Sequence, residues 1–301
     1  MIADLFIHAI APYCTVLSKS CKRASITAMK FASVRDLAQL PYFTLDPGGN
    51  LHLAEGIARS IIDFHTHIGW RFGKTGPIRH DRTPPVLHFF PETDASIDLN
   101  RYSAYDFTPK LKLRCSIETV KPFVTTQGIT HTHTAANLCR EMARLHIEQS
   151  IVLAVDRGNS RNSLDLLGIV RRYPNLIPFV SIDPKSHEIE KTFIKYVKAG
   201  AYGIKIHPPM QTVRPNHPGI MKILDLAGQY HLPVLYHCGY SPLMPVFERR
   251  FSRMEDFQDA VRSHPDTTII LGHSGIDDHE AVLTMQKKYS NVYAELSGQP
   301  P

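Results

Sequence analysis

The sequence lacks the features that mark membrane-spanning and disulfide-rich proteins. The apolar N-terminal stretch Met1–Leu17 is interrupted by Asp4 and Pro12 and is too short to span a bilayer. Basic residues follow this stretch rather than precede it, which is the wrong order for a secretory signal. Five cysteines are widely spaced: Cys14, Cys21, Cys115, Cys139 and Cys238. An odd, scattered set fits reduced thiols in a cytoplasmic chain better than a disulfide framework.

Two further absences exclude other classes of protein. Lysine and arginine are scattered rather than gathered in a stripe, and the net charge of +6 is modest for 301 residues, so no nucleic-acid partner is indicated. No Gly-x-Gly-x-x-Gly turn follows an early strand, which argues against a dinucleotide-binding fold. No Gly-x-Ser-x-Gly nucleophile elbow is present either. With 43% hydrophobic and 21% charged residues, the composition is that of a soluble globular protein.

A regular alternation of short apolar strands and helices begins near residue 134. Strands are predicted at residues 61–67, 150–155, 176–182, 201–207, 232–237, 268–273 and 292–296. Helices are predicted from about Thr134, which can cap the first of them, and at 164–173, 187–198, 219–229, 254–263 and 280–289. Such an alternation implies a parallel sheet covered by helices. The pattern predicts an α/β fold, a TIM-type (β/α)8 barrel in which seven of the eight strands are present.

The regions outside this alternation divide the chain further. Residues 1–58 are predicted to form an N-terminal extension with short helices, one of them at 51–57. Residues 59–301 are predicted to form the barrel, with a long insertion at about 69–130. That insertion has no sustained period, and a segment of this kind is usually a lid, a binding loop or disordered.

The chemistry is concentrated at the ends of the predicted strands. His65 and His67 close an apolar strand and, with a period of two, face the same side. Further polar residues end three later strands: Lys205, His207, His237 and His273. Because the C-terminal ends of barrel strands converge on one mouth, these residues predict a metal site there.

Four motifs resemble one known family. They are Asp63-Phe64-His65-Thr66-His67, Gly203-Ile204-Lys205-Ile206-His207-Pro208, His237-Cys238-Gly239 and Leu271-Gly272-His273-Ser274-Gly275. Together they resemble the amidohydrolase superfamily, and within it the branch related to aminocarboxymuconate-semialdehyde decarboxylase. The similarity extends from about Ile61 to the C-terminus, apart from the insertion.

The resemblance implies a role for each matching residue. His65, His67 and His237 would bind one divalent metal ion, most simply zinc. His273 would be the catalytic group that activates water, or else a further ligand. Lys205 occupies the place of a carboxylated lysine in some members, but here is expected to bind a substrate carboxylate or phosphate. His207 would assist it, or would simply form a hydrogen bond within the barrel mouth. Asp63 would be a carboxylate behind the ligands, or would close a hydrogen bond at the barrel floor.

The family pattern also includes an aspartate at the end of an eighth strand, which this sequence does not supply. Asp277 and Asp278 follow the sixth strand and Glu295 lies on the seventh, so none is expected to replace it. A truncated sequence is therefore expected. The expected function is metal-dependent hydrolysis of a small molecule. A non-oxidative decarboxylase and a catalytically incomplete binding protein are the alternatives. The substrate is expected to be a small molecule, with a carboxylate as one option; no membrane partner is expected, and a homodimer is possible.

Overall fold

The computed structural model describes the chain in several ranges: residues 34–49, 51–54, 60–71, 76–86, 128–240, 246–276 and 278–297, with six single residues between 109 and 125. Most of the predicted N-terminal extension and most of the predicted insertion lie outside these residues. Within the described part, no helix has the length and apolar character needed to cross a membrane.

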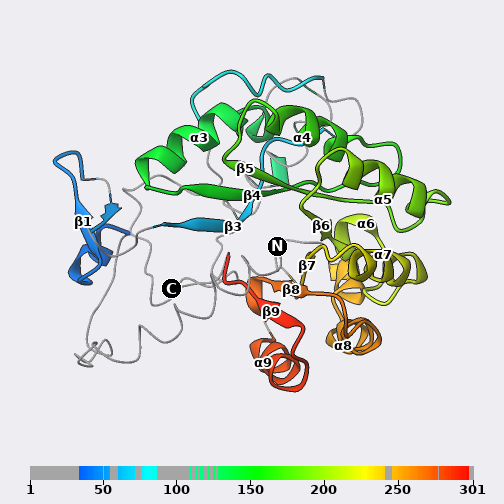
Figure 1. Cartoon of the computed structure of the whole chain (residues 1–301). Coiled ribbons are helices and arrows are strands. Elements are labelled where there is room, and N and C mark those ends of the chain that lie inside the picture. The colour runs from blue at the N-terminus through cyan, green and yellow to red at the C-terminus, as the bar shows by residue number, and fades with distance from the viewer. Residues whose placement is uncertain are drawn as a thin grey trace.

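Seven parallel strands form one curled sheet whose order follows the chain (Figure 1). They are β3 (Ile62–Thr66), β4 (Gln149–Leu153), β5 (Leu176–Val180), β6 (Gly203–Ile206), β7 (Val234–His237), β8 (Ile269–Gly272) and β9 (Val292–Ala294). Each strand pairs in parallel with its neighbours in sequence, and the register of β3 on β4 shifts between Asp63 and Thr66. The described strands therefore fill seven positions of a (β/α)8 barrel, as the sequence predicts.

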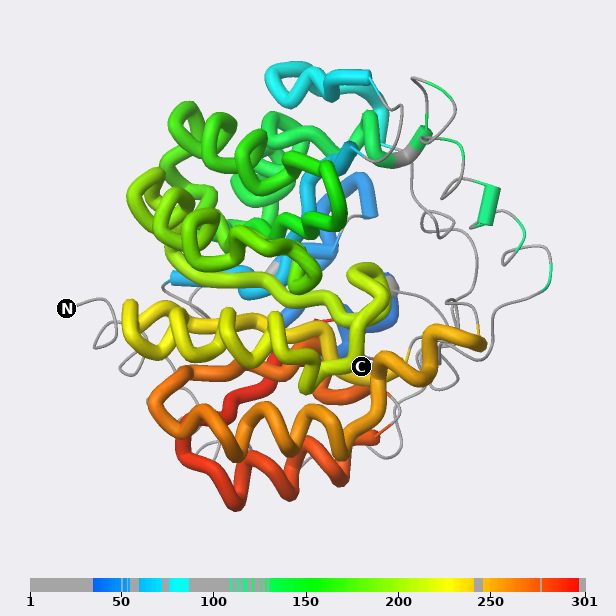
Figure 2. Tube along the Cα trace, turned by 90° about the vertical axis from the view of Figure 1, so that its right-hand side faces the viewer, coloured from blue at the N-terminus to red at the C-terminus, as the bar shows by residue number. Residues whose placement is uncertain are grey.

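Helices cover the outer face of this sheet. They are α3 (Ala135–Arg144), α4 (Asn162–Val170), α5 (Ile189–Lys198), α6 (Pro208–Gln211), α7 (Pro218–Gln229), α8 (Met254–Ser263) and α9 (His279–Lys288). Figure 2 shows α7, α8 and α9, from yellow to red, running side by side. Thr134 caps α3 as predicted, since its Oγ1 accepts a hydrogen bond from the backbone N–H of Asn137 at 3.1 Å. Short 3₁₀ turns lie at Val34–Gln39, Ile129–His131, Val246–Phe251 and His273–Gly275.

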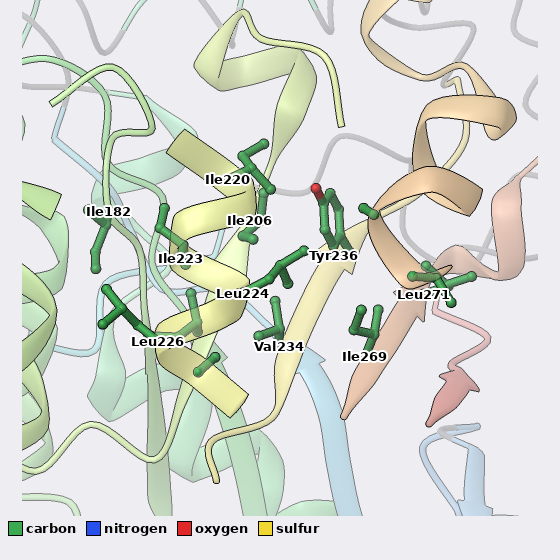
Figure 3. Packing of buried hydrophobic residues seen from close by; sticks show 14 of the residues in the cluster. Ile182, Ile206, Ile220, Ile223, Leu224, Leu226, Val234, Tyr236, Ile269 and Leu271 are labelled. Atoms are coloured by element: carbon green, nitrogen blue, oxygen red, sulfur yellow. The ribbon is translucent and has the colours of Figure 1, made fainter. Parts of the chain in front are cut away.

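The main hydrophobic core lies between the helices and the outer face of the sheet. Figure 3 shows Ile220, Ile223 and Leu224 of α7 in one buried cluster with Val234 of β7 and Ile269 of β8, and Leu224 lies beside Val234. All five are fully buried. Burying each such side chain stabilises the fold by about 1.5–3 kcal/mol relative to leaving it in water.

A second core fills the inside of the barrel. Ile151, Leu153, Phe179, Leu235 and Ile270 pack together there, all from strands. Their alternation with outward-facing residues matches the two-residue period of a strand. At Gly203 a Cβ atom would come within 2.5 Å of the Phe179 ring, so this small residue leaves room for the ring. The packed interior supports the floor of the mouth.

One local prediction is wrong. Residues 51–57 are expected to begin a helix, but Leu51–Leu53 form strand β2, which pairs antiparallel with β1 (Phe43–Leu45). The turn between them includes Gly49 at φ 77°, a left-handed conformation that glycine adopts readily. A three-residue strand has too few positions to separate helical from extended spacing, so the partner strand decides the structure.

Candidate metal centre

Histidines from four strand ends come together at the mouth of the barrel. The rings of His65 and His273 have centroids 4.6 Å apart, and those of His237 and His273 are 4.8 Å apart. His207 stacks on His237 at 3.9 Å with an interplanar angle of 8°. His65, His67, His207, His237 and His273 thus form the predicted cluster, which we call the histidine cluster.

Glu295 holds His65 from the far end of the sheet. Its Oε1 lies 2.7 Å from Nδ1 of His65, and it also accepts the backbone N–H of His273 at 2.7 Å. Burial raises the pKa of the Glu295 carboxyl, but hydrogen bonds from His65 and Ser297 outweigh this and lower it to about 2. The carboxylate is therefore ionised and can only accept, so Nδ1 of His65 carries the proton.

The same reasoning fixes the tautomer of His67. Its Nδ1 lies 2.9 Å from the carbonyl oxygen of Leu153, which can only accept, so Nδ1 donates. Burial lowers the pKa of both rings, to about 4 for His65 and well below the usual value for His67, and the charge on Lys205 lowers both further. Both rings are neutral, and each Nε2 carries a bare lone pair. These two Nε2 atoms lie 3.2 Å apart, an unfavourable contact unless a cation shares them.

A second chain of hydrogen bonds prepares His237. Nδ1 of His273 donates to the carbonyl oxygen of Ser297 at 2.8 Å, which leaves its Nε2 to accept from Nδ1 of His237 at 3.0 Å. His237 then has a lone pair on Nε2. Among the described residues this buried atom has no hydrogen-bond partner. Nε2 of His237 therefore has a free lone pair, as do the Nε2 atoms of His65 and His67, although no ring nitrogen of His237 lies within 4.8 Å of both other rings.

The distances between possible ligand atoms group a different set of three residues. One ligand atom from each of His65, His273 and Glu295 lies within 4.8 Å of the others. We favour the three histidines with bare Nε2 atoms, because Oε1 of Glu295 already accepts two hydrogen bonds. A carboxylate that orients a histidine ligand from behind is common in metal sites and raises the basicity of that ligand. Three imidazoles suit zinc and related divalent ions.

Lys205 lies close to the histidine cluster, and its charge acts on the rings of His65, His67 and His207. Lys205 is fully buried on β6, and among the described residues its Nζ has no hydrogen-bond partner. Burial lowers its pKa to about 7, while the charge of Glu295 acts in the opposite direction. His207 begins α6, and its Nδ1 accepts the backbone N–H of Met210 at 3.3 Å.

Asp63 has a local role. Its Oδ1 accepts the backbone N–H of His65 at 3.0 Å, which fixes the strand end that carries the ligand pair. Burial raises its pKa, partly offset by that hydrogen bond. Asp63 therefore supports the ligand strand through the backbone.

The structure brings together every residue singled out from the sequence and adds Glu295. From its sequence position, Glu295 is expected on the seventh strand and has no expected part in the site. The sequence feature that could have identified Glu295 is its position at the end of a strand, which is the criterion that selected the histidines. The reach of its side chain across to β3 depends on how far the sheet curls, which no sequence pattern reveals.

An α/β barrel with histidines gathered at its C-terminal mouth is an arrangement suited to holding a metal ion. The family model described as amidohydrolase matches residues 62–301, and the chain belongs to that family. No curated protein matches the chain.

Three solved structures illustrate the structural similarity. An uncharacterised TIM-barrel protein from Bordetella bronchiseptica is 15% identical with a TM-score of 0.48, and the match covers 57% of this chain and 63% of that protein. This chain therefore spans less than two thirds of that protein's length. The 5-carboxyvanillate decarboxylase of Sphingomonas paucimobilis is 11% identical with a TM-score of 0.45, covering 80% and 82%. An amidohydrolase from Burkholderia multivorans with bound Zn is 15% identical with a TM-score of 0.41, covering 54% and 58%.

Proposed function

We propose that this protein is a metal-dependent hydrolase of a small-molecule substrate. The observation that carries the proposal is the pair of Nε2 lone pairs of His65 and His67, 3.2 Å apart with both tautomers fixed from behind. His237 would complete the ligand set. A divalent ion held there, with zinc the first candidate, would supply Lewis acidity and activate water near neutral pH.

The residues around the ligands have separate tasks in this proposal. Glu295 keeps His65 in the tautomer that presents Nε2. His273 holds its Nδ1 proton on the Ser297 carbonyl, so its Nε2 faces the cluster and can accept a proton from water as a general base. In the structure this atom accepts a hydrogen bond from Nδ1 of His237 at 3.0 Å, and it would be free to take the proton once that hydrogen bond is released.

Lys205 favours a substrate that carries an anionic group. Its buried Nζ lacks a partner among the described residues, and a carboxylate or phosphate would supply one. The approach of such an anion would also raise the pKa of Lys205 and keep it charged. The same feature supports a second candidate, a non-oxidative decarboxylase in which Lys205 holds the carboxylate.

Metal content and turnover together test the proposal. The chain, His67→Ala and His187→Ala would be purified alike, and bound metal would be quantified by elemental analysis. His187 is exposed and serves as the control. We expect one divalent ion in the chain and in His187→Ala, and a severe loss in His67→Ala.

Substrate screens would then separate the two candidates. Lactones and esters would be compared with aromatic and unsaturated carboxylic acids, each with and without added zinc. Zinc-dependent turnover of the first group supports a hydrolase, and carbon dioxide release from the second supports a decarboxylase. A wild-type chain that takes up no metal would overturn both.

A further inference from the structure

A separate cavity lies outside the barrel wall, next to the metal centre. It has a volume of about 440 Å³, is open to solvent on one side, and is lined by residues 68–71 after β3, residues 77–81 and helix α4. Its apolar walls include Ile68, Ile78, Leu166 and Ile169. This volume falls in the range of pockets that hold small organic ligands.

Trp70 separates the cavity from the histidine cluster. Its ring packs edge-on against His67, with centroids 4.5 Å apart and an angle of 82°, and the same residue lines the cavity. Val152 and Ala154 also line it, and both belong to the outer core between the sheet and the helices α3 and α4. The cavity thus lies beside β4 on the side of helix α4, with Trp70 between it and His67.

Polar residues line the cavity together with the apolar ones, among them Arg71, His80 and Asp165. Nδ1 of His80 is buried and has no hydrogen-bond partner among the described residues. Burial lowers the pKa of His80 to about 4, so the ring is neutral and presents a hydrogen-bonding edge rather than a charge. Apolar walls beside an unsatisfied imidazole nitrogen fit a ligand that has an apolar body and a hydrogen-bonding group.

The charges at the rim select for an anion. Arg71 is paired with Asp165, and Arg79 with Asp81. Arg172 also lines the cavity, is exposed, and is within ion-pair distance of no carboxylate in the described part of the chain. Three guanidinium groups against two carboxylates leave one excess positive charge at the entrance.

We propose that this cavity is a small-molecule binding site, distinct from the metal centre, for a ligand with an apolar body and one anionic group. Its occupant would contact the indole of Trp70 from the side opposite His67. The site belongs to the outer layer of the fold, so it does not depend on which reaction the metal centre performs.

Gly168 offers a direct way to close the cavity. It lines the cavity from α4, and a Cβ atom added there would meet no atom within 4 Å. Gly168→Phe should therefore fill the space without a backbone clash. Gly168→Ala is the matched control, because it changes the same backbone position and leaves most of the volume open.

Calorimetric titration of the zinc-loaded chain with 4-phenylbutyrate tests the site. We expect saturable binding, unchanged in Gly168→Ala and at least tenfold weaker in Gly168→Phe. Circular dichroism and zinc content would show that the filled variant is folded. Arg172→Gln, a change at an exposed position, should remove the preference for 4-phenylbutyrate over the neutral 4-phenylbutyramide.

The metal-site variant His67→Ala separates this site from the metal centre. We expect it to bind 4-phenylbutyrate as the wild type does, even when its zinc is lost. Loss of binding in His67→Ala would place the probe on the metal and overturn the proposal. Undiminished binding in Gly168→Phe, or no saturable binding by the wild type, would overturn it as well.

Discussion

Nδ1 of His65 lies 2.7 Å from Oε1 of Glu295, and this contact joins the first strand of the sheet to the last. Both side chains are nearly buried, so the pair is protected from competition by water. Because the carboxylate fixes the proton on Nδ1, it decides which nitrogen of His65 can bind a metal ion.

Replacing Glu295 with glutamine should therefore weaken metal binding without leaving a cavity where the side chain was. Glutamine is nearly the same shape but carries no charge, and it can donate as well as accept. We expect zinc affinity to fall by about 10–100-fold, the usual effect of losing a partner behind a ligand. Competition with a chromophoric chelator would measure this. Glu280→Gln, an exposed change on α9, should leave zinc affinity unaltered; equal affinities for both variants would contradict the role of Glu295.

Trp70 should report metal binding through its fluorescence. It is the only tryptophan in the sequence, and its ring contacts His67 edge-on at 4.5 Å. Paramagnetic Co²⁺ or Cu²⁺ bound by His67 should quench its emission, and an excess of Zn²⁺ should reverse much of that quenching. In His67→Ala we expect little saturable quenching. Quenching of the same size in that variant would show that the ions bind elsewhere.

His80 should make the fold sensitive to mild acid. Its pKa is lowered to about 4 in the folded chain, mainly by burial, against 6.5 as the ordinary value. The unfolded chain therefore binds a proton between pH 6.5 and about 4 that the folded chain does not, so stability is full above pH 6.5 and decreases as the pH falls. Allowing for solvent screening, the loss between pH 7 and pH 5 is about 1–2 kcal/mol.

Urea unfolding at those two pH values checks the effect. His80→Phe should lose less stability on acidification than the wild type does, by about 1–2 kcal/mol. His187→Phe removes an exposed histidine and should behave as the wild type. An unchanged pH dependence in His80→Phe would contradict the burial of a neutral imidazole at this position.

Two glycines should respond in opposite ways to alanine. Gly239, two residues after His237, has φ 90°, and a Cβ atom there would lie 2.2 Å from the carbonyl oxygen of Gly275. Gly239→Ala should destabilise the fold by at least about 2 kcal/mol and disturb the strand ends that carry His237 and His273. Gly168→Ala, in the middle of α4 with open space around it, should stabilise the fold by about 0.5–1 kcal/mol. Denaturant midpoints of the two variants would measure both shifts, and a shift of the same sign in both would contradict this difference.

The sequence was most informative where one residue period dominated. Runs such as Ile151–Leu153 and Val234–His237 are nearly continuous in apolar character, and a parallel strand covered on both faces requires that composition. The same rule placed His65, His67, Lys205 and His237 at strand ends, because strand direction alone decides which ends share the mouth.

The features of the site that could not be predicted from the sequence depend on how the sheet curls in three dimensions. The tautomers of the cluster rest on backbone carbonyls of Leu153 and Ser297, which any residue would supply. The reach of Glu295 to His65 depends on the curvature of the whole sheet. The direction of His273 rests on its φ of 56° in the turn after β8, a conformation that no spacing rule predicts.

The sheet order has a consequence for how the chain acquires its site. Each strand pairs with the strand before it, so the barrel can grow stepwise from the N-terminal side as synthesis proceeds. The link between His65 and Glu295 spans 230 positions and carries a large loop-closure cost, which is repaid only when the intervening strands are in place. The ability to bind a metal ion should therefore be acquired last during folding. The rate of metal uptake during refolding would report when the last described strand, β9, joins the sheet.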